Sequence, residues 1–166
     1  MGPADIPLIQ SVGRATYEPY YQHIWYPGGV DWYVDRCFNV NALTAELADP
    51  NVAYYLPRDK NGEIVGLLKL LLEKPTPDGS IDNALYLEKI YLMPAFFGRG
   101  AGQALMAFAF EKAATLGRQA VWLMVLKNGP VQAYTRAGFQ TTGEVIWEFD
   151  LLRETERGGW VMVREI

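Results

Sequence analysis

The sequence has very few of the residues that bind metals or form cross-links. It contains one cysteine, Cys37, and one histidine, His23, among 166 residues. A single cysteine forms no internal disulfide, and zinc sites of the Cys/His kind need more ligands than these two residues supply. Cys37 lies among hydrophobic residues and is interpreted as a packing residue. The composition largely excludes disulfide scaffolds, metal sites and catalytic triads built on histidine.

The sequence also lacks an excess of positive charge and any long hydrophobic run. Its 15 Lys and Arg against 19 Asp and Glu give a net charge of −4 with no basic cluster, so we expect no nucleic-acid partner and a slight preference for cations. The most hydrophobic stretches, 65–72 and 105–110, are far shorter than the roughly 20 residues of a membrane-spanning helix. The first residues lack the features of a signal peptide. We therefore expect a cytoplasmic protein with no membrane partner.

Half of the residues are hydrophobic, and no repeat, low-complexity tract or linker interrupts the chain, so residues 1–166 are expected to form one domain. Hydrophobic spacing and turn residues predict helices over 5–19, 30–38 and 42–47, a hairpin of strands 52–56 and 64–72 around Asn61-Gly62, a strand over 84–92, a helix over 101–117, a strand over 120–126, a helix over 130–136, and a closing hairpin of strands 146–152 and 160–163. Many aromatic residues lie in the N-terminal region, and they either form the wall of a site or pack the helices: Trp25, Tyr26, Trp32, Tyr33 and Phe38.

A glycine-rich turn separates the strand over 84–92 from the following helix. Gly98, Gly100 and Gly102 alternate with Arg99 and Ala101. Glycines at a helix N-terminus expose backbone N–H groups and suit a pyrophosphate, to which Arg99 could add a positive charge. A dinucleotide-binding fingerprint would need glycine at position 103, where Gln103 stands, and a Walker loop would need Gly-Lys-Ser/Thr. A tight turn that binds nothing explains the three glycines equally well.

The residues around this turn point to one family. Residues 87–94, Leu-Glu-Lys-Ile-Tyr-Leu-Met-Pro, and 97–102, Phe-Gly-Arg-Gly-Ala-Gly, resemble the acetyl-CoA motif of the GNAT superfamily of N-acetyltransferases. The family pattern is Gln or Arg, any two residues, Gly, any residue, and then Gly or Ala. Gly100 and Gly102 match this pattern, whereas Phe97 stands where Gln or Arg belongs. The departure keeps the backbone of the loop and removes one polar side chain.

A second stretch supports the resemblance. Residues 125–139 look like the second cofactor motif of the family, with an Asn after a strand, a helix that carries a Tyr, and then Gly-Phe. The interval from Tyr134 to Gly138 agrees with the family, and that from Asn128 to Tyr134 is one residue shorter than usual. Residues 141–144 and 161–163 resemble the final hairpin of polyamine and small-amine members. Such proteins commonly begin with a strand before the first helix, for which this chain has almost no room.

The resemblance implies a fold and a co-substrate. The fold would be of the α+β, three-layer class, with a mixed, mostly antiparallel sheet of six to seven strands between helices and with splayed fourth and fifth strands. The co-substrate would be acetyl-CoA, whose pantetheine arm pairs with the exposed backbone of strand four and whose acetyl carbonyl accepts from the N–H of Leu92. The implied cofactor-binding residues are Tyr91, Leu92, Phe97, Gly98, Arg99, Gly100, Ala101, Gly102, Gln103, Asn128 and Tyr134.

Acetyl transfer to an amine requires an acid for the departing thiolate and a base for the ammonium. Tyr134 is the candidate acid, because a phenol with a pKa of about 10 is protonated at neutral pH; otherwise it is a core aromatic residue. Glu88 is the candidate base, because strand alternation places it on the same face as Ile90 and Leu92; otherwise it forms a solvated ion pair with Lys89.

Three further residues have titrating or acidic side chains without a firm role. His23, the single histidine, is a candidate for proton transfer but is interpreted as structural. Glu144 and Glu148 either attract a cationic substrate or belong to a solvated strand face.

The motifs are consistent with two functions. The first is an acetyl-CoA-dependent N-acetyltransferase that acts on a primary amine of a small molecule, including a polyamine, or of a peptide, by direct transfer in a ternary complex. The alternative is a non-catalytic module that binds or senses acyl-CoA; Phe97 and the short interval after Asn128 favour it, and Tyr134 disfavours it. A homodimer formed through the terminal strands stays open.

Overall fold

The computed structural model describes residues 1–166. Three helices come first: α1 (Ile6–Tyr21), α2 (Gly29–Phe38) and α3 (Val40–Ala48). Six strands follow: β1 (Val52–Tyr55), β2 (Gly66–Leu71), β3 (Ala84–Leu92), β4 (Ala120–Leu126), β5 (Gln140–Ile146) and β6 (Gly158–Glu165). Helix α4 (Ala101–Thr115) connects β3 to β4, and α5 (Val131–Arg136) connects β4 to β5. None of these helices is both long enough and hydrophobic enough to cross a membrane.

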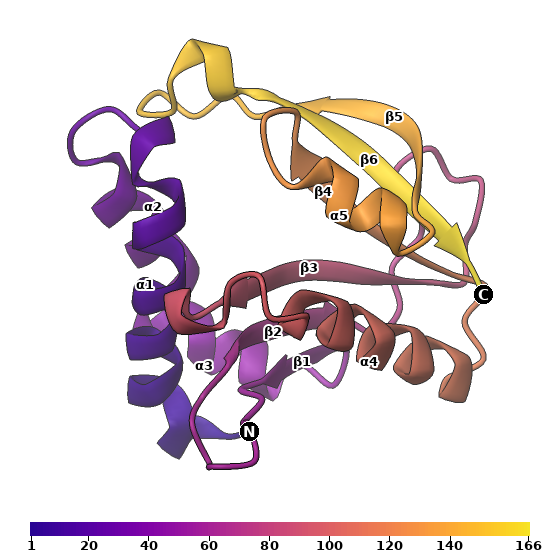
Figure 1. The fold of residues 1–166 in the computed structure, drawn as a ribbon, viewed down its shortest axis with the longest axis horizontal. Coiled ribbons are helices and arrows are strands. Elements are labelled where there is room, and N and C mark those ends of the chain that lie inside the picture. The colour runs from indigo at the N-terminus through magenta and orange to yellow at the C-terminus, as the bar shows by residue number, and fades with distance from the viewer.

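One mixed sheet joins all six strands in the order β1-β2-β3-β4-β6-β5. Every neighbouring pair is antiparallel except β3 and β4, which are parallel. These two strands pair only from Ala84–Tyr86 to Ala120–Trp122 and then separate, which Figure 1 shows as the opening between β3 and the β4–α5 side. The expected class, with a mostly antiparallel sheet and two splayed central strands, is confirmed.

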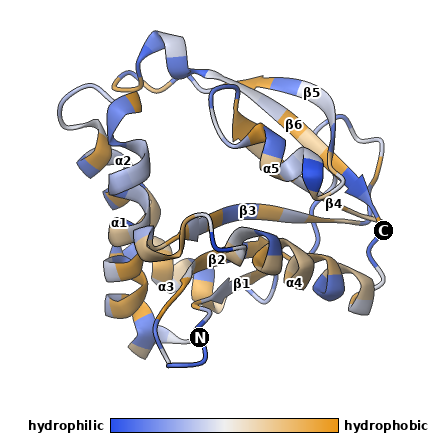
Figure 2. Ribbon diagram, in the orientation of Figure 1, coloured by the Kyte–Doolittle hydropathy of each residue, from blue (hydrophilic) through white to orange (hydrophobic).

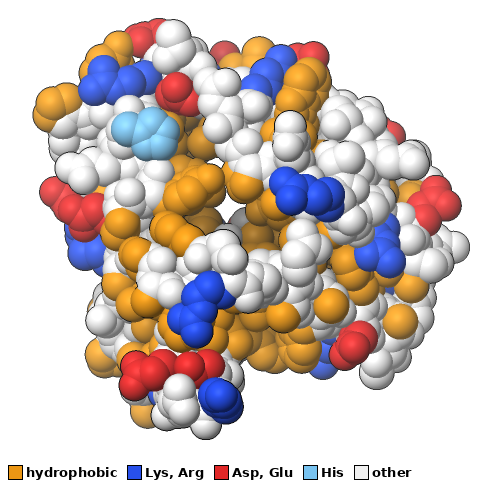
Figure 3. All heavy atoms as spheres, viewed as in Figure 1, with side chains coloured by type: hydrophobic (Ala, Val, Ile, Leu, Met, Phe, Trp, Pro, Cys, Tyr) orange, Lys and Arg blue, Asp and Glu red, His pale blue; other side chains and the backbone are white.

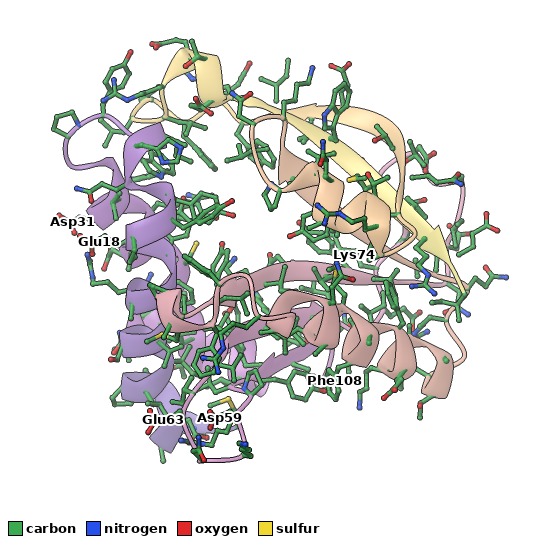
Figure 4. All side chains as sticks on the ribbon, viewed as in Figure 1. Glu18, Asp31, Asp59, Glu63, Lys74 and Phe108 are labelled. Carbon is green, nitrogen blue, oxygen red and sulfur yellow. The ribbon has the colours of Figure 1, made fainter.

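Helices cover the two faces of the sheet in separate layers. Helices α4 and α5 pack on one face, where Met106 and Ala109 of α4 meet Leu68 and Leu123 of the strands. Phe108, labelled in Figure 4, adds an edge-to-face contact with Tyr55 at a centroid distance of 4.9 Å. Helices α1, α2 and α3 form a second core against the opposite face of β1 and β2 (Figure 1). The three-layer arrangement leaves the opening between β3 and β4 flanked by both helix layers.

The N-terminal helix follows its hydrophobic spacing but differs in detail from the prediction. Ile9, Val12 and Thr16 are buried at intervals of three and four residues, as an amphipathic helix requires. Asp5 accepts the N–H of Gly2 at 2.8 Å and does not cap α1. The helix also continues past Pro19 to Tyr21, because the rings of Tyr17 and Tyr21 stack at 4.6 Å on its inner side.

The β1–β2 hairpin is confirmed. Its tight turn includes Gly62, which has a φ of +84°, and Asp59 accepts the N–H groups of Asn61 and Glu63, both at 2.9 Å. Figure 4 labels Asp59 and Glu63 at this end of the molecule. The first strand ends at Tyr55 and the second begins at Gly66, so both stop farther from the turn than predicted. An isolated bridge joins Arg58 and Ile64 between the strands and the turn.

The closing hairpin is shifted relative to the prediction. Strand β5 ends at Ile146, and the predicted strand 146–152 is instead an irregular segment after it. Leu152 forms a bridge with Trp25, and Phe149 stacks on the Trp25 ring at 6.3 Å. The hydrophobic side chains that suggested a strand are buried against the N-terminal helices instead, so tertiary packing decides the conformation of this segment.

Candidate active site

The opening between β3 and β4 exposes backbone groups of β3. Met93 N–H donates to the carbonyl of Val65 at 2.8 Å, so Leu92 and Gly66 form a non-hydrogen-bonded pair of the antiparallel ladder. The backbone N–H and C=O of Leu92 therefore point away from β2 and into the opening. Two residues earlier, Ile90 faces Leu68 and has the same orientation. Two N–H groups on one strand are available to a ligand, at Ile90 and Leu92.

Two adjacent cavities occupy this opening. The larger has a volume of about 240 Å³ and the smaller about 160 Å³. Both are lined by Tyr21, Ile90, Tyr91, Pro130 and Tyr134, so they meet at these residues. The space-filling view shows the hollow in this face of the molecule and the hydrophobic side chains on its walls (Figure 3). Tyr134 therefore borders both cavities.

The glycine-rich turn lies at the entrance to the smaller cavity. Gly98 and Gly100 have φ angles of +68° and +80°, a region that favours glycine, and Gly100 is the N-cap of α4. No side chain caps the helix, so its first N–H groups are free for an anion. Gly102 lines the cavity itself. The predicted turn is therefore present at the N-terminus of a 15-residue helix and beside a cavity.

Other predicted residues of the turn have defined contacts. The guanidinium of Arg99 donates to the carbonyl of Ala95 at 3.1 Å, and Gln103 donates to the carbonyl of Ala133 at 3.2 Å. Gln103 thereby ties α4 to α5 across the opening. Phe97 is 43% exposed, lines the smaller cavity and lies edge-on to Tyr20 at 5.8 Å. The structure thus places a hydrophobic wall where family members have a polar side chain.

Tyr134 occupies the junction of the two cavities. It lies on α5, and its ring makes an edge-to-face contact with Phe139 at 6.0 Å. Its hydroxyl makes no hydrogen bond within the chain and is free to meet a ligand. Burial raises the pKa of this hydroxyl well above its ordinary value, so Tyr134 stays protonated at neutral pH. The geometry suits a proton donor in the opening.

Glu88 lies on the opposite face of β3 from the one predicted. The register passes from Lys69–Lys89 to Leu70–Leu87, which makes Glu88 the unpaired residue of a β-bulge. A bulge reverses the alternation, so Ile90 packs with Leu87 on the α4 face, while Glu88 points to the other face. Strand alternation alone was wrong here because the extra residue restarts the period. Glu88 nevertheless lines the larger cavity.

Glu88 belongs to a partly buried group of charges that comes from three separate segments of the chain. Lys69 pairs with Glu88 and with Oε1 of Glu46 at 2.6 Å, and Oε2 of Glu46 accepts the hydroxyl of Tyr54 at 2.5 Å. Burial alone would raise the pKa of Glu88, but the charges of Lys89 and Lys69 outweigh it and hold the pKa below its ordinary value. Glu88 is therefore ionised at neutral pH. The sequence signal that could have revealed this group is Lys69, a charged residue inside the otherwise hydrophobic predicted strand 64–72.

Aromatic side chains from distant parts of the chain form the wall of the larger cavity. Tyr17 stacks on Tyr33 at 4.8 Å, and Trp25 donates its indole N–H to the hydroxyl of Tyr17 at 2.9 Å. Trp147 and Phe149 reach the same cavity from the segment after β5. Of the aromatic residues considered as a wall, Trp25 and Tyr33 line the cavity, whereas Tyr26, Trp32 and Phe38 do not.

Several candidate residues lie outside both cavities. Asn128 is exposed in the turn after β4, and its side-chain amide donates a hydrogen bond to Oε2 of Glu156 at 3.3 Å. His23 and Glu148 are exposed, and Glu144 pairs with Lys127 at 3.1 Å on the surface. Cys37 is partly buried and packs against the core of the N-terminal helices. The structure brings together the glycine turn, Leu92, Tyr134 and Glu88, and leaves these five apart from them.

Comparison with known proteins agrees with this geometry. The model of the acetyltransferase (GNAT) family matches residues 13–139. An uncharacterized N-acetyltransferase of Mycobacterium tuberculosis is 32% identical over 142 residues, which are 84% of this chain and 84% of that protein.

Two solved structures share the fold. The PaiA N-acetyltransferase of Thermoplasma acidophilum, in complex with coenzyme A, has a TM-score of 0.75 at 15% identity. The match covers 100% of this chain and 96% of that chain. A spermidine N-acetyltransferase SpeG mutant of Vibrio cholerae has a TM-score of 0.69 at 17% identity over 99% of this chain and 90% of that chain. The opening between β3 and β4 and the glycine turn agree with the family match. This chain belongs to the GNAT family and is an N-acetyltransferase.

Proposed function

We propose that the protein binds acetyl-CoA in the opening between β3 and β4 and transfers the acetyl group directly to a primary amine held in the larger cavity. The observation that carries the proposal is the meeting of the two cavities at Tyr134, beside the free N–H groups of Ile90 and Leu92. One cavity opens toward the glycine turn and the other toward the aromatic wall, so each substrate has its own approach.

Backbone groups of the glycine turn and of β3 would bind acetyl-CoA. The free N–H groups of residues 98–102 would hold the pyrophosphate at the N-terminus of α4. The pantetheine arm would add to the exposed edge of β3 at Leu92 like an extra strand. Ile90 lines both cavities, whereas Leu92 lines only the smaller one. The N–H of Leu92 would donate to the acetyl carbonyl oxygen, and the N–H of Ile90, two residues and roughly 7 Å farther along the same edge of β3, would be free for another acceptor of the bound substrates.

The reaction needs one nucleophile and two proton transfers. The neutral amine nitrogen attacks the thioester carbon, the C–S bond breaks, and the backbone N–H of Leu92 stabilises the negative charge that develops on oxygen. Tyr134 donates its proton to the departing thiolate, and the amine loses a proton to the ionised Glu88 directly or through water. Cys37 lines neither cavity, so no acyl-cysteine step is invoked.

Acetyl-CoA binding and thiol release test the proposal. Incubation with acetyl-CoA and a panel of primary amines should release free thiol, which a chromogenic disulfide detects. Gly102→Val should abolish acetyl-CoA binding in calorimetry, because a side chain at this position meets Leu92 and fills the smaller cavity. Gly143→Ala, whose added Cβ approaches nothing closer than 3.9 Å, is the matched control. Binding without thiol release from any amine would favour the sensor and refute the transferase.

A further inference from the structure

We infer, on the basis of the acetyl transfer proposed above, that the acceptor is an amino acid with an aromatic or other hydrophobic side chain. Lys89 binds its carboxylate, Glu88 binds its ammonium group, and the aromatic wall takes its side chain.

Lys89 is a buried cation without a hydrogen bond. Its side chain is 8% exposed and lines the larger cavity. Its only ion-pair contact is Oε2 of Glu88 at 3.6 Å, and this oxygen already pairs with Lys69. A buried ammonium normally finds hydrogen-bond acceptors. The ammonium of Lys89 therefore has N–H donors without an acceptor in the chain, and the carboxylate of an acceptor amino acid in the cavity would supply the hydrogen bonds.

Figure 2 shows a hydrophilic stretch within the mostly hydrophobic ribbon of β3. In the sequence of this strand, Ala84–Leu92, the two charged residues Glu88 and Lys89 stand at mid-length. The bulge brings both side chains to the larger cavity, of which they are the only charged lining residues. One negative and one positive group, 3.6 Å apart, match the ammonium and the carboxylate of a zwitterion, which are separated by one carbon atom.

The rest of the cavity suits a hydrophobic body. Tyr17, Tyr33, Trp25, Trp147 and Phe149 supply aromatic surface. The volume of about 240 Å³ lies below the roughly 300 Å³ at which pockets for drug-sized ligands begin, so the acceptor is small.

A polyamine fits this cavity poorly. Its additional positive charges would meet Lys89 and would find no acidic lining residue other than Glu88. Likeness to the Vibrio cholerae spermidine acetyltransferase, at 17% identity, concerns the fold alone.

The experiment compares three acceptors at saturating acetyl-CoA: L-phenylalanine, phenethylamine, which lacks only the carboxylate, and spermidine. Initial rates of thiol release give kcat/KM for each. A charge-assisted hydrogen bond contributes roughly 1.5–3 kcal/mol, so we expect L-phenylalanine to exceed phenethylamine by about 10- to 100-fold. Lys89→Met should remove this advantage, mainly by raising KM for L-phenylalanine, so that the ratio of kcat/KM for L-phenylalanine to that for phenethylamine falls to about 1.

Lys60→Met, on the exposed turn between β1 and β2, is the control for the loss of a positive charge. Melting temperature and acetyl-CoA affinity of Lys89→Met establish that the fold and the cofactor site are intact. Equal or better turnover of phenethylamine or spermidine would overturn the inference and leave the transferase standing. An equal loss on all three acceptors in Lys89→Met would also overturn it. Thiol release from none of the amines, with acetyl-CoA bound, would instead refute the proposed function and the inference together.

Discussion

Gly66 of β2 controls the position of the β3 backbone at the site. A Cβ built on Gly66 would lie 2.1 Å from the carbonyl oxygen of Tyr91, whereas real Cβ atoms stay at least 3.0 Å from such a neighbour. The obstacle is backbone and not the end of a flexible side chain, so in Gly66→Ala the two strands must move apart by about 0.9 Å. Tyr91 lies between Ile90 and Leu92, so the N–H groups of both move with it.

The shift should be visible in both stability and rate. Overpacking of this kind costs roughly 1–3 kcal/mol, which for a chain of this size lowers the melting temperature by roughly 2–12 °C. A displacement near 1 Å of groups that position the reacting atoms costs up to about 100-fold in rate. We therefore expect kcat/KM for acetyl-CoA to fall by about 10- to 100-fold at a temperature where the variant is fully folded.

Calorimetric melting and steady-state kinetics measure the two effects. Gly143→Ala is the control, because it makes the same change in strand β5 without a contact closer than 3.9 Å, and it should match the wild type in both assays. A stable Gly66→Ala with unchanged kinetics would refute the reasoning. A destabilised variant with wild-type kcat/KM would show that the strain is absorbed away from Ile90 and Leu92, and would refute the role of these N–H groups.

Three further predictions concern side chains of the site. Tyr134→Phe should lower kcat by about 100-fold with acetyl-CoA affinity unchanged in calorimetry, because a general acid contributes about 10²- to 10⁴-fold; an unaltered kcat would remove Tyr134 from the mechanism. Lys69→Met should destabilise the fold by roughly 3 kcal/mol in urea unfolding, since it removes the cation shared by two partly buried carboxylates, and Lys69→Met with Glu46→Gln and Glu88→Gln should recover most of the loss. The folded-state pKa of Glu88 is depressed, so its stabilisation is present above the unfolded-state pKa and disappears as the pH falls through the folded value. Urea unfolding from pH 6 to 3 should therefore show a smaller loss of stability for Glu88→Gln than for the wild type, and parallel curves would contradict this assignment.

Local sequence patterns predicted the elements that depend on near neighbours. The spacing of hydrophobic residues in α1, the turn at Gly62 and the alternation of glycines before α4 are readable from the chain, because each depends on contacts within a few residues. The two motifs also placed the cofactor turn and Tyr134 at the same site, where the structure has the junction of two cavities.

Contacts between distant segments decided the rest of the site. The bulge at Glu88 exists only because β2 and β3 pair in a particular register, so no periodicity within β3 alone could assign the face of Glu88 or reveal Lys89 as a cavity residue. The free N–H of Ile90 depends on the same register and on the separation of β4. Residues 147–152 carry the composition of a strand but pack against α1 and α2.

The sequence by itself determined the order of helices and strands, the glycine turn that opens α4 and the scarcity of cysteine and histidine, because these follow from local geometry and composition. Only the tertiary structure decided which side chains line the acceptor cavity and which backbone N–H groups are free. The physical reason is that strand register, burial and charge pairing arise between residues far apart in the chain, such as Lys69 with Glu88 and Trp25 with Leu152.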